Sequence, residues 1–220
     1  MLHKFIPYTQ KELTNEEQLE KSKAFYEQLD ERRSVREYSD RDIDVEVIEN
    51  IIKTAGTAPS GAHKQPWTFC LVSNPELKSK IREAAEVEEK KSYGSRMSER
   101  WKEDLAPLGT TWEKPFIEIA PYIIVVFKRV HETVDGGKRN NYYVNESIGI
   151  ACGMLISAIH NAGLVTLTHT PSPMNFLGKI LNRPENERAY LLLPVGHPAK
   201  NAEVPDIHRK KLNELCVVYK

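Results

Sequence analysis

The sequence contains few cysteines, and their placement excludes several classes of protein. The three that it has, Cys70, Cys152 and Cys216, lie far apart and are odd in number. They provide neither the framework of a small disulfide-rich domain nor the closely spaced pairs of a zinc site. Scattered thiols of this kind are typical of a reducing compartment, so we expect a cytoplasmic protein.

An excess of charge of either sign is also missing. Lysine and arginine together number 31, aspartate and glutamate together also number 31, and the formal net charge is zero. A general nucleic-acid or membrane-surface binder needs a basic face, so we expect neither partner.

Long apolar runs are missing too. No stretch approaches the roughly 18 apolar residues of a membrane span, and the N-terminus shows no secretory signal.

Motifs of several common enzyme classes are absent. The chain has no Walker loop, no Gly-x-Gly-x-x-Gly fingerprint and no Gly-x-Ser-x-Gly nucleophile turn. Its seven histidines are scattered and pair with no nearby set of ligands, so we expect no metal site.

The chain does contain enough apolar sequence for a core. Hydrophobic residues make up 40% of its 220 residues, which is too much for a disordered chain. The length predicts a single domain, 1–220, in which we expect 1–12 to form an N-terminal tail.

The spacing of apolar residues predicts helices and strands that alternate along the chain. Thr14 and Glu17 have the spacing of a capping box, and Asp44 is typical of a helix N-cap. Two almost continuously apolar runs predict strands buried on both faces. The predicted helices are 14–30, 45–55, 75–92 (with a continuation to 105), 146–162 and 174–181, and the predicted strands are 67–72, 121–127, 164–168 and 190–195. Strands separated by helices predict an α+β layered fold.

Several segments are predicted to form a loop, to pair at a sheet edge, or to contact a partner subunit. Residues 131–140 contain two adjacent glycines and are expected to form a loop, and the apolar end 216–219 is expected to add an edge strand to this chain or another. The helix 146–162 is apolar almost all round, which predicts burial inside the fold or between subunits. The first helix has only a sparse apolar stripe, which indicates contact with something else, such as a partner subunit. Residues 87–100 are nearly all polar, which on composition alone predicts a solvated helix or a mobile loop.

Three arginines and a serine lie together in Arg32-Arg33-Ser34-Val35-Arg36. The planar guanidinium group binds phosphate or carboxylate with two parallel hydrogen bonds, so this motif suits a phosphorylated ligand. An ordinary basic surface patch is the alternative interpretation.

The loop at 57–66 is a second candidate for ligand contact. Gly61 permits close approach of the backbone to a flat ligand, and Ser60 can donate a hydrogen bond. A plain helix-to-strand turn is the alternative, and His63 alone is weak evidence for a function.

A row of threonines at 166–170 is the third candidate. Thr166, Thr168 and Thr170 alternate along a predicted strand and its exit, which places them on one side. Strand propensity explains threonines at such positions equally well.

These three motifs, in this order, resemble the nitroreductase superfamily of flavin enzymes. The superfamily has an Arg-x-Ser-x-Arg-like motif, a Pro-Ser loop before a Pro-Trp strand, and a late Leu-Pro-Val-Gly strand that leads to a basic pair, found here at 32–36, 59–67, 193–198 and 209–210. Within it, the chain is most similar to the iodotyrosine deiodinases, through residues 57–63, 88–93 and 112–114. The resemblance covers nearly all of the chain from about residue 20.

The resemblance implies a nitroreductase-like α+β fold and a flavin site. A central, mostly antiparallel sheet flanked by helices would form an intertwined homodimer with FMN at the interface. The residues implied to contact FMN are Arg32, Arg33, Ser34, Arg36, Ser60, Thr168, His169, Thr170 and Arg209. Thr170 would reach flavin N5. His169 and the following Ser172-Pro173-Met174 depart from the pattern of the vertebrate enzymes.

The resemblance also implies an amino-acid substrate. Glu89 would pair with the substrate ammonium, while Lys114 and Tyr93 would bind its carboxylate. The backbone amide of Ala62 would donate to the phenolate oxygen. Residues 87–114 would then form an active-site lid that orders when the zwitterion binds.

The expected activity is therefore FMN-dependent reductive dehalogenation of halogenated tyrosines, which releases halide and tyrosine, with electrons from NAD(P)H or a reductase. A general NAD(P)H-dependent nitro or quinone reductase is the first alternative, and a non-catalytic flavin-storage or sensing protein is the second. The trio of Glu89, Tyr93 and Lys114 favours the dehalogenase, because a promiscuous reductase needs no residues that bind a zwitterion.

Overall fold

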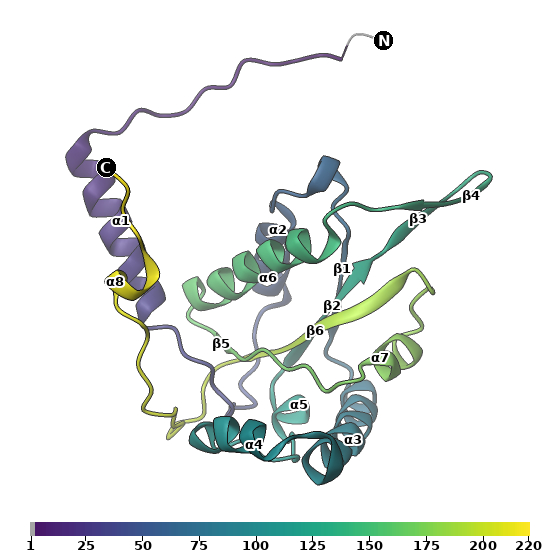
Figure 1. Ribbon diagram of the computed structural model, residues 1–220. Helices are drawn as coiled ribbons and strands as arrows, with labels where there is room; N and C mark the ends of the chain where they lie inside the picture. The colour runs from purple at the N-terminus through teal and green to yellow at the C-terminus, as the bar shows by residue number, and fades with distance from the viewer. Residues whose placement is uncertain (1–2) are drawn as a thin grey trace. The chain divides into compact units, whose positions relative to one another are not determined.

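The computed structural model describes residues 3–220 and divides the chain into two compact units, one ending at Arg32 and one running from Arg33 to Lys220. The first unit contains α1 (Asn15–Asp30) (Figure 1). Its predicted capping box is confirmed, because Thr14 Oγ1 accepts from the Glu17 amide at 3.2 Å and Glu17 Oε2 accepts from the Thr14 amide at 2.8 Å. No residue of α1 is buried.

The second unit is built around a four-stranded sheet in the order β1-β2-β6-β5, with every neighbouring pair antiparallel. The strands are β1 (Trp67–Val72), β2 (Tyr122–Arg129), β5 (Val165–Thr166) and β6 (Glu187–Gly196). The strand predicted at 164–168 is shorter than expected, because after Thr166 the backbone pairs with β6 again only at His169. The predicted α+β fold with an antiparallel sheet is confirmed.

Helices cover both faces of this sheet (Figure 1). Along β2 the side chains of residues 123–127 are all fully buried, so the predicted burial on both faces is confirmed. Ile124 and Val126 pack with α2 (Val45–Gly56) and α6 (Val144–Asn161), whereas the alternate residues pack with α3 (Pro75–Lys91), α5 (Phe116–Ile119) and α7 (Asn175–Ile180). The period of two along a strand produces these two cores.

The predicted N-cap of α2 is confirmed, because the Asp44 carboxylate accepts from the Glu46 amide at 2.9 Å. Ile48, Ile51 and Ala55 are buried as their spacing predicts. Two residues with the same spacing differ, because Val45 is 48% exposed and Ile52 is only half-buried.

The segment predicted as a loop at 131–140 is a β-hairpin, so that prediction is wrong. It consists of β3 (His131–Val134) and β4 (Gly137–Asn140), which form a separate two-stranded sheet. Gly136 and Gly137 have φ values of 91° and 145°, which only glycine adopts readily and which permit the tight turn. The hairpin residues are mostly exposed, so no buried apolar alternation marked them as strands.

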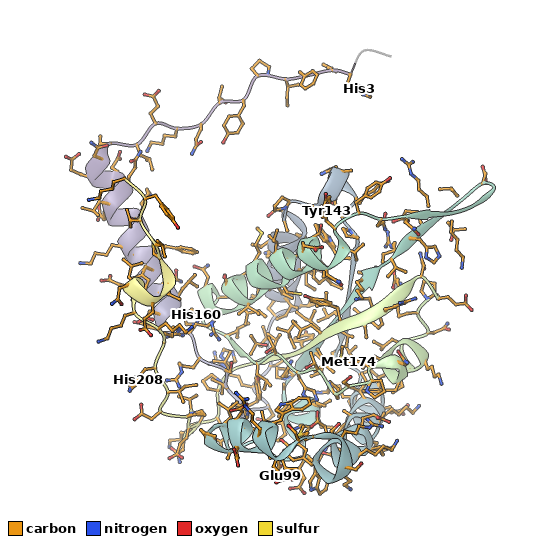
Figure 2. All side chains as sticks on the ribbon, viewed as in Figure 1. His3, Glu99, Tyr143, His160, Met174 and His208 are labelled. Carbon is orange, nitrogen blue, oxygen red and sulfur yellow. The ribbon has the colours of Figure 1, made fainter. Side chains whose placement is uncertain are left out.

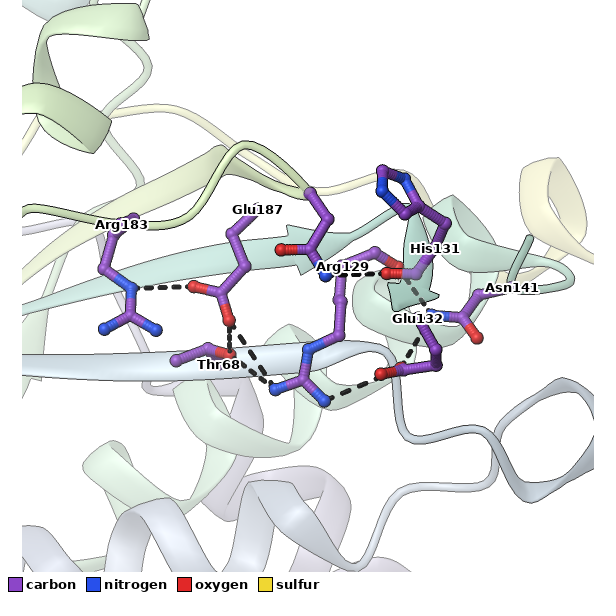
Figure 3. Close-up of polar contacts among 8 residues, drawn as sticks. Thr68, Arg129, His131, Glu132, Asn141, Arg183 and Glu187 are labelled. Atoms are coloured by element: carbon purple, nitrogen blue, oxygen red, sulfur yellow. Dashed lines mark hydrogen bonds and ion pairs between the residues drawn. The ribbon is translucent and has the colours of Figure 1, made fainter. Parts of the chain in front are cut away.

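A polar network holds the base of this hairpin against the main sheet (Figure 3). Arg129 lies 3.6 Å from both Glu132 and Glu187, and its guanidinium donates to Thr68 at 3.1 Å. Arg183 closes the network through a 2.7 Å ion pair with Glu187. The paired charges allow the Glu187 carboxylate to be buried.

The remaining elements complete the second unit. They are the short 3-10 helices η1 (Gly61–His63) and η3 (Ala106–Leu108), the π-helix η2 (Ser92–Arg96), α4 (Glu99–Leu105) and α8 (Leu212–Leu215). No strand forms at 216–219 within this chain, where Val217 and Val218 are 76% and 70% exposed, so pairing of this segment with another chain stays a prediction. Over residues 3–220, no helix combines the length and apolar character needed to cross a lipid bilayer.

The helix α6 buries one side and exposes the other within this chain. Ile148, Leu155 and Ile159 are fully buried, whereas Ile150 is 48% exposed and lies beside exposed Gly149 and Gly153. One side of α6 is therefore buried inside the fold, and burial of its other side between subunits stays a prediction.

Candidate active site

Three of the predicted substrate-binding residues lie together in the structure. Glu89 lies in the last turn of α3, Tyr93 lies in η2, and Lys114 lies just before α5. The Lys114 Nζ atom is 3.6 Å from Glu89 Oε2 and 5.7 Å from the centre of the Tyr93 ring. Glu89 belongs to an α-helix and Tyr93 to the π-helical turn that follows it, yet both side chains reach Lys114.

Each polar group of this trio has a partner within the chain. The Lys114 ammonium also donates to Thr110 Oγ1 at 3.3 Å and to the carbonyl of Thr111. The Tyr93 hydroxyl donates to the Thr110 carbonyl at 3.1 Å. Only 4% of the Lys114 side chain and 12% of the Glu89 side chain are exposed, so the ion pair is largely removed from water.

Burial makes both members of the ion pair harder to charge. It raises the pKa of Glu89, and the Lys114 charge only partly opposes this effect. It lowers the pKa of Lys114, where Glu89 opposes the shift and the charge of Arg36 adds to it. A carboxylate and an ammonium that are poorly solvated and only loosely paired are suited to a ligand that brings the opposite charge to each of them.

The arginine motif lies beside β5. The amide of Val35 donates to the Thr166 carbonyl at 3.3 Å, and Ser34 forms a parallel bridge with Thr166. Arg33 donates to the carbonyl of Pro205, so the C-terminal segment that leads to Arg209 also runs past this motif.

Arg36 and Arg32 are two further predicted phosphate contacts. Burial raises the pKa of Tyr93 and lowers the pKa of Lys114, and the nearby charge of Arg36 opposes the first shift and adds to the second. Arg32 is the last residue of the first unit.

The threonines at 166–170 differ in exposure, so the prediction that they share one side is only partly correct. Thr168 and Thr170 are exposed, whereas Thr166 is buried, so the three hydroxyls do not form one accessible row. The reason is that the strand ends at Thr166 and the chain is then held to β6 through His169, whose amide donates to the Leu192 carbonyl at 2.9 Å.

The side chain of His169 is buried without a hydrogen-bond partner for Nε2 within residues 3–220. Its ring meets the Phe116 ring edge-on, with centroids 5.5 Å apart. Burial, aided by the charge of Lys114, lowers the pKa of His169 to about 3, so the ring is neutral at physiological pH. A buried polar atom of this kind usually has a partner, and it marks a place where a bound group could supply one.

The loop that contains Ser60 and Ala62 is held in an unusual conformation. Ala62, His63 and Gln65 have positive φ values of 49°, 54° and 47°, which are rare for residues other than glycine and occur most often at functional sites. The Ser60 hydroxyl accepts from the Gln65 amide at 2.9 Å, which helps to close the loop.

Contacts with the start of α6 hold this loop. The Gly61 amide donates to Ser147 Oγ at 3.2 Å, and Ser147 is buried. A Cβ atom on Gly61 would lie 2.8 Å from a ring carbon of Tyr143 and 3.0 Å from the Tyr142 carbonyl, so only glycine fits here. The sequence indicated neither the role of Ser147 nor that of Tyr143.

The two groups of predicted residues lie at different edges of the sheet. The Ser60 loop precedes β1 at one edge, whereas Ser34 and Thr166 lie at β5 on the other, three strand spacings or about 14 Å away. They also lie near opposite ends of α6, which Tyr143 and His160 mark in Figure 2. Across the part of the chain described here, no three His, Cys, Asp or Glu side chains gather in a way that could hold a metal ion.

Comparison with known proteins identifies the family. The model of the nitroreductase family matches residues 29–197. A curated protein from Haliscomenobacter hydrossis, named iodotyrosine deiodinase, is 62% identical over 216 residues, which cover 98% of this chain and 97% of that protein. A human protein named iodotyrosine deiodinase 1 is 47% identical over 214 residues, which cover 96% of this chain and 74% of that protein.

A solved structure agrees with these matches. It is described as oxidized iodotyrosine deiodinase bound to FMN and 3-iodo-L-tyrosine, and it is 32% identical to this chain. The two superpose with a TM-score of 0.78, over 89% of this chain and 98% of that one. Because the family model covers most of the sequence and these relatives match it almost from end to end, the chain belongs to the nitroreductase family.

Proposed function

We propose that this protein is an FMN-dependent oxidoreductase that removes halide reductively from halogenated tyrosines and releases tyrosine. The observation that carries the proposal is the convergence of Glu89, Tyr93 and Lys114, which brings together two buried opposite charges and a hydroxyl, the groups that complement an amino-acid zwitterion. The relatives named iodotyrosine deiodinase support the same activity.

The residues present fit FMN. Arginines and a serine beside β5 are the groups that bind phosphate well, and the exposed hydroxyls of Thr168 and Thr170 are available to polar atoms of a flavin. The unpartnered Nε2 of His169 supports a bound group next to this segment. The residues that would hold FMN are Arg32, Arg33, Ser34, Arg36, Ser60, Thr168, His169, Thr170 and Arg209.

The substrate would displace contacts that the trio makes within the chain. The substrate ammonium would take Glu89, and the substrate carboxylate would take Lys114 and the Tyr93 hydroxyl. Because each charged group exchanges one ionic partner for another, little extra desolvation is needed on binding. Residues 87–114 would therefore act as the lid of the site.

The chemistry replaces a carbon–halogen bond with a carbon–hydrogen bond. It consumes two electrons and one proton and releases halide, and reduced FMN supplies the electrons when bound. The Ala62 amide would donate to the phenolate oxygen, and the positive φ of Ala62 holds that amide in a fixed direction before substrate binds. NAD(P)H or a reductase would reduce the flavin.

We also propose that the site is shared between two copies of this chain. Ser60 and Ala62 lie at the opposite edge of the sheet from Ser34 and Thr166, so one copy would supply the loop and the other the phosphate-binding motif. The exposed side of α6 around Ile150 offers an apolar surface for such a homodimer.

Iodide release from 3-iodo-L-tyrosine tests the proposal. FMN-loaded protein reduced with dithionite should release iodide and tyrosine, and Glu89→Gln should raise the KM strongly. The matched variant Glu99→Gln, in an exposed ion pair on α4, should leave the KM unchanged. With 2-iodophenol, which has no zwitterion, Glu89→Gln should make no difference.

The alternative activities predict other results. A general nitro or quinone reductase would turn over nitroaromatic compounds with NAD(P)H and would not release iodide. A flavin-storage protein would bind FMN and turn over none of these substrates. Either result would exclude the dehalogenase.

A further inference from the structure

Arg96 connects two segments that are distant in the sequence. Its Nη1 atom donates to Glu88 Oε2 at 2.7 Å and to the carbonyl of Ser172 at 3.2 Å. Glu88 is next to Glu89 in α3, and Arg96 lies in the same π-helical turn as Tyr93. Ser172 lies two residues after Thr170. One guanidinium therefore joins the segment that carries the proposed zwitterion contacts to the loop that carries the proposed flavin contact.

The carboxylate fixes the direction of this guanidinium. The Glu88 side chain is only 17% exposed and accepts from Arg96 at one oxygen and from Lys91 Nζ, at 2.9 Å, at the other. A charge-assisted hydrogen bond to a carboxylate is stronger than one between neutral groups, so Glu88 holds Arg96 in place while Arg96 contacts Ser172. Lys91 is paired to the same carboxylate, and within residues 3–220 no hydrogen bond joins its ammonium to Ser172.

We infer that Arg96 is a positioning residue, which couples the ordering of residues 87–114 over a zwitterion to the position of the Thr170 loop. The inference rests on the proposed function. When Glu89 and Tyr93 take the substrate, the turn between Glu88 and Arg96 becomes fixed, and the contact with the Ser172 carbonyl then restrains the loop. Coupling of this kind is reciprocal, so a restrained loop also favours an ordered lid.

Lysine cannot replace arginine fully, because the compact ammonium lacks the planar set of donors that serves two acceptors in fixed directions.

Hydrogen–deuterium exchange of the FMN-loaded protein tests the inference. Exchange would be measured for residues 87–114 and for the amides of Thr170, Ser172 and Met174, with and without saturating 3-iodo-L-tyrosine. In the wild type we expect the ligand to slow exchange in both segments. In Arg96→Met, we expect slowing in residues 87–114 to remain, while ligand-bound exchange in the loop becomes roughly threefold to tenfold faster than in the wild type.

The matched control is Lys91→Met, which removes the other basic partner of Glu88 and should keep the loop protected. Arg96→Lys should restore part of the protection. A kinetic readout accompanies the exchange: Arg96→Met should lower kcat for iodide release roughly threefold to tenfold and change the KM by less than about twofold.

Three results would overturn the inference, and they are distinguishable. Loop protection in Arg96→Met equal to that of the wild type would exclude coupling through this residue. Loss of protection in both segments of Arg96→Met, with both segments still protected in Lys91→Met, would show that Arg96 only stabilises the fold of the lid. If iodotyrosine protects neither segment of a wild type that still releases iodide, the inference fails and the proposed function stands, whereas a wild type that also releases no iodide contradicts the proposed function.

Discussion

The Ser60–Ala62 loop and the lid segment, residues 87–114, are held in place by different forces. The loop, which spans residues 57–66, is fixed by its backbone: Ala62, His63 and Gln65 have positive φ, and Gly61 lies close against Tyr143. The lid is held by side-chain charges, of which the ion pairs of Glu88 and Glu89 are examples. Backbone strain cannot be exchanged for contacts with a ligand, whereas ion pairs can.

This difference matches two tasks in recognition. The phenol end of a halotyrosine is planar and needs one amide at one position, which a rigid loop provides. The zwitterion end carries two charges that can replace the partners of Glu89 and Lys114, which an adaptable lid provides.

Lys114→Met should have the largest effect. It removes the partner of the substrate carboxylate and leaves Glu89 buried without its counter-ion, so the KM for 3-iodo-L-tyrosine should rise on the order of 100-fold or more. The control Lys102→Met breaks an exposed 2.9 Å pair with Glu99 and should change the KM less than about twofold. A rise of less than about fivefold in Lys114→Met would remove Lys114 from the zwitterion site.

Gly61→Ala should have the next largest effect. The added Cβ would lie 3.0 Å from the Tyr142 carbonyl, so the loop must shift, and kcat/KM should fall roughly tenfold with a loss of about 1–3 kcal/mol in stability. Gly56→Ala is the control, because nothing lies within 4 Å of its Cβ and it ends a helix. That variant should keep full activity and unfold at the same or a higher temperature. Full activity in Gly61→Ala would show that the loop is not rigid.

The smallest effect concerns pH. Burial raises the pKa of Glu89 above its ordinary value of 4.5, so the free protein takes up a proton there at a higher pH than an exposed glutamate does. The substrate ammonium binds the charged form, and binding therefore releases that proton. Affinity measured by titration of the flavin absorbance should fall as the pH decreases through this raised value, and it should be independent of pH over the same range in Glu89→Gln. A parallel decrease in both proteins would assign the titration to another group.

Much of the fold could be predicted from local patterns. The capping box of Thr14 and the apolar runs of β2 and β6 act through neighbours in the sequence, so their outcome needed no tertiary information. The exposed hairpin at 131–140 could not be found in this way, because its strands have no buried face.

Some features of the candidate site could likewise be predicted from the sequence, and others could not. Residue types and order indicated the arginine motif and the Ser60 loop, whereas only the resemblance to the family indicated the zwitterion trio, because composition alone predicted a solvated helix or a mobile loop at 87–100. The positive φ of Ala62, the contact between Gly61 and Ser147 and the bond from Arg96 to Ser172 depend on segments up to 86 residues apart, and no local pattern encodes them. The buried Thr166 was misplaced because the strand ends two residues earlier than its alternation implies.

Because the Ser60 loop and the Ser34 motif lie at opposite edges of the sheet, two defective alleles of this protein could complement each other. In a homodimer with shared sites, a copy damaged only in the Ser60 loop and a copy damaged only in the Ser34 motif can assemble together. One of the two sites in such a mixed dimer then receives both of its defective parts, and the other receives two intact ones. Two alleles that are each inactive alone would thus complement one another, with up to half of the sites in every mixed dimer restored.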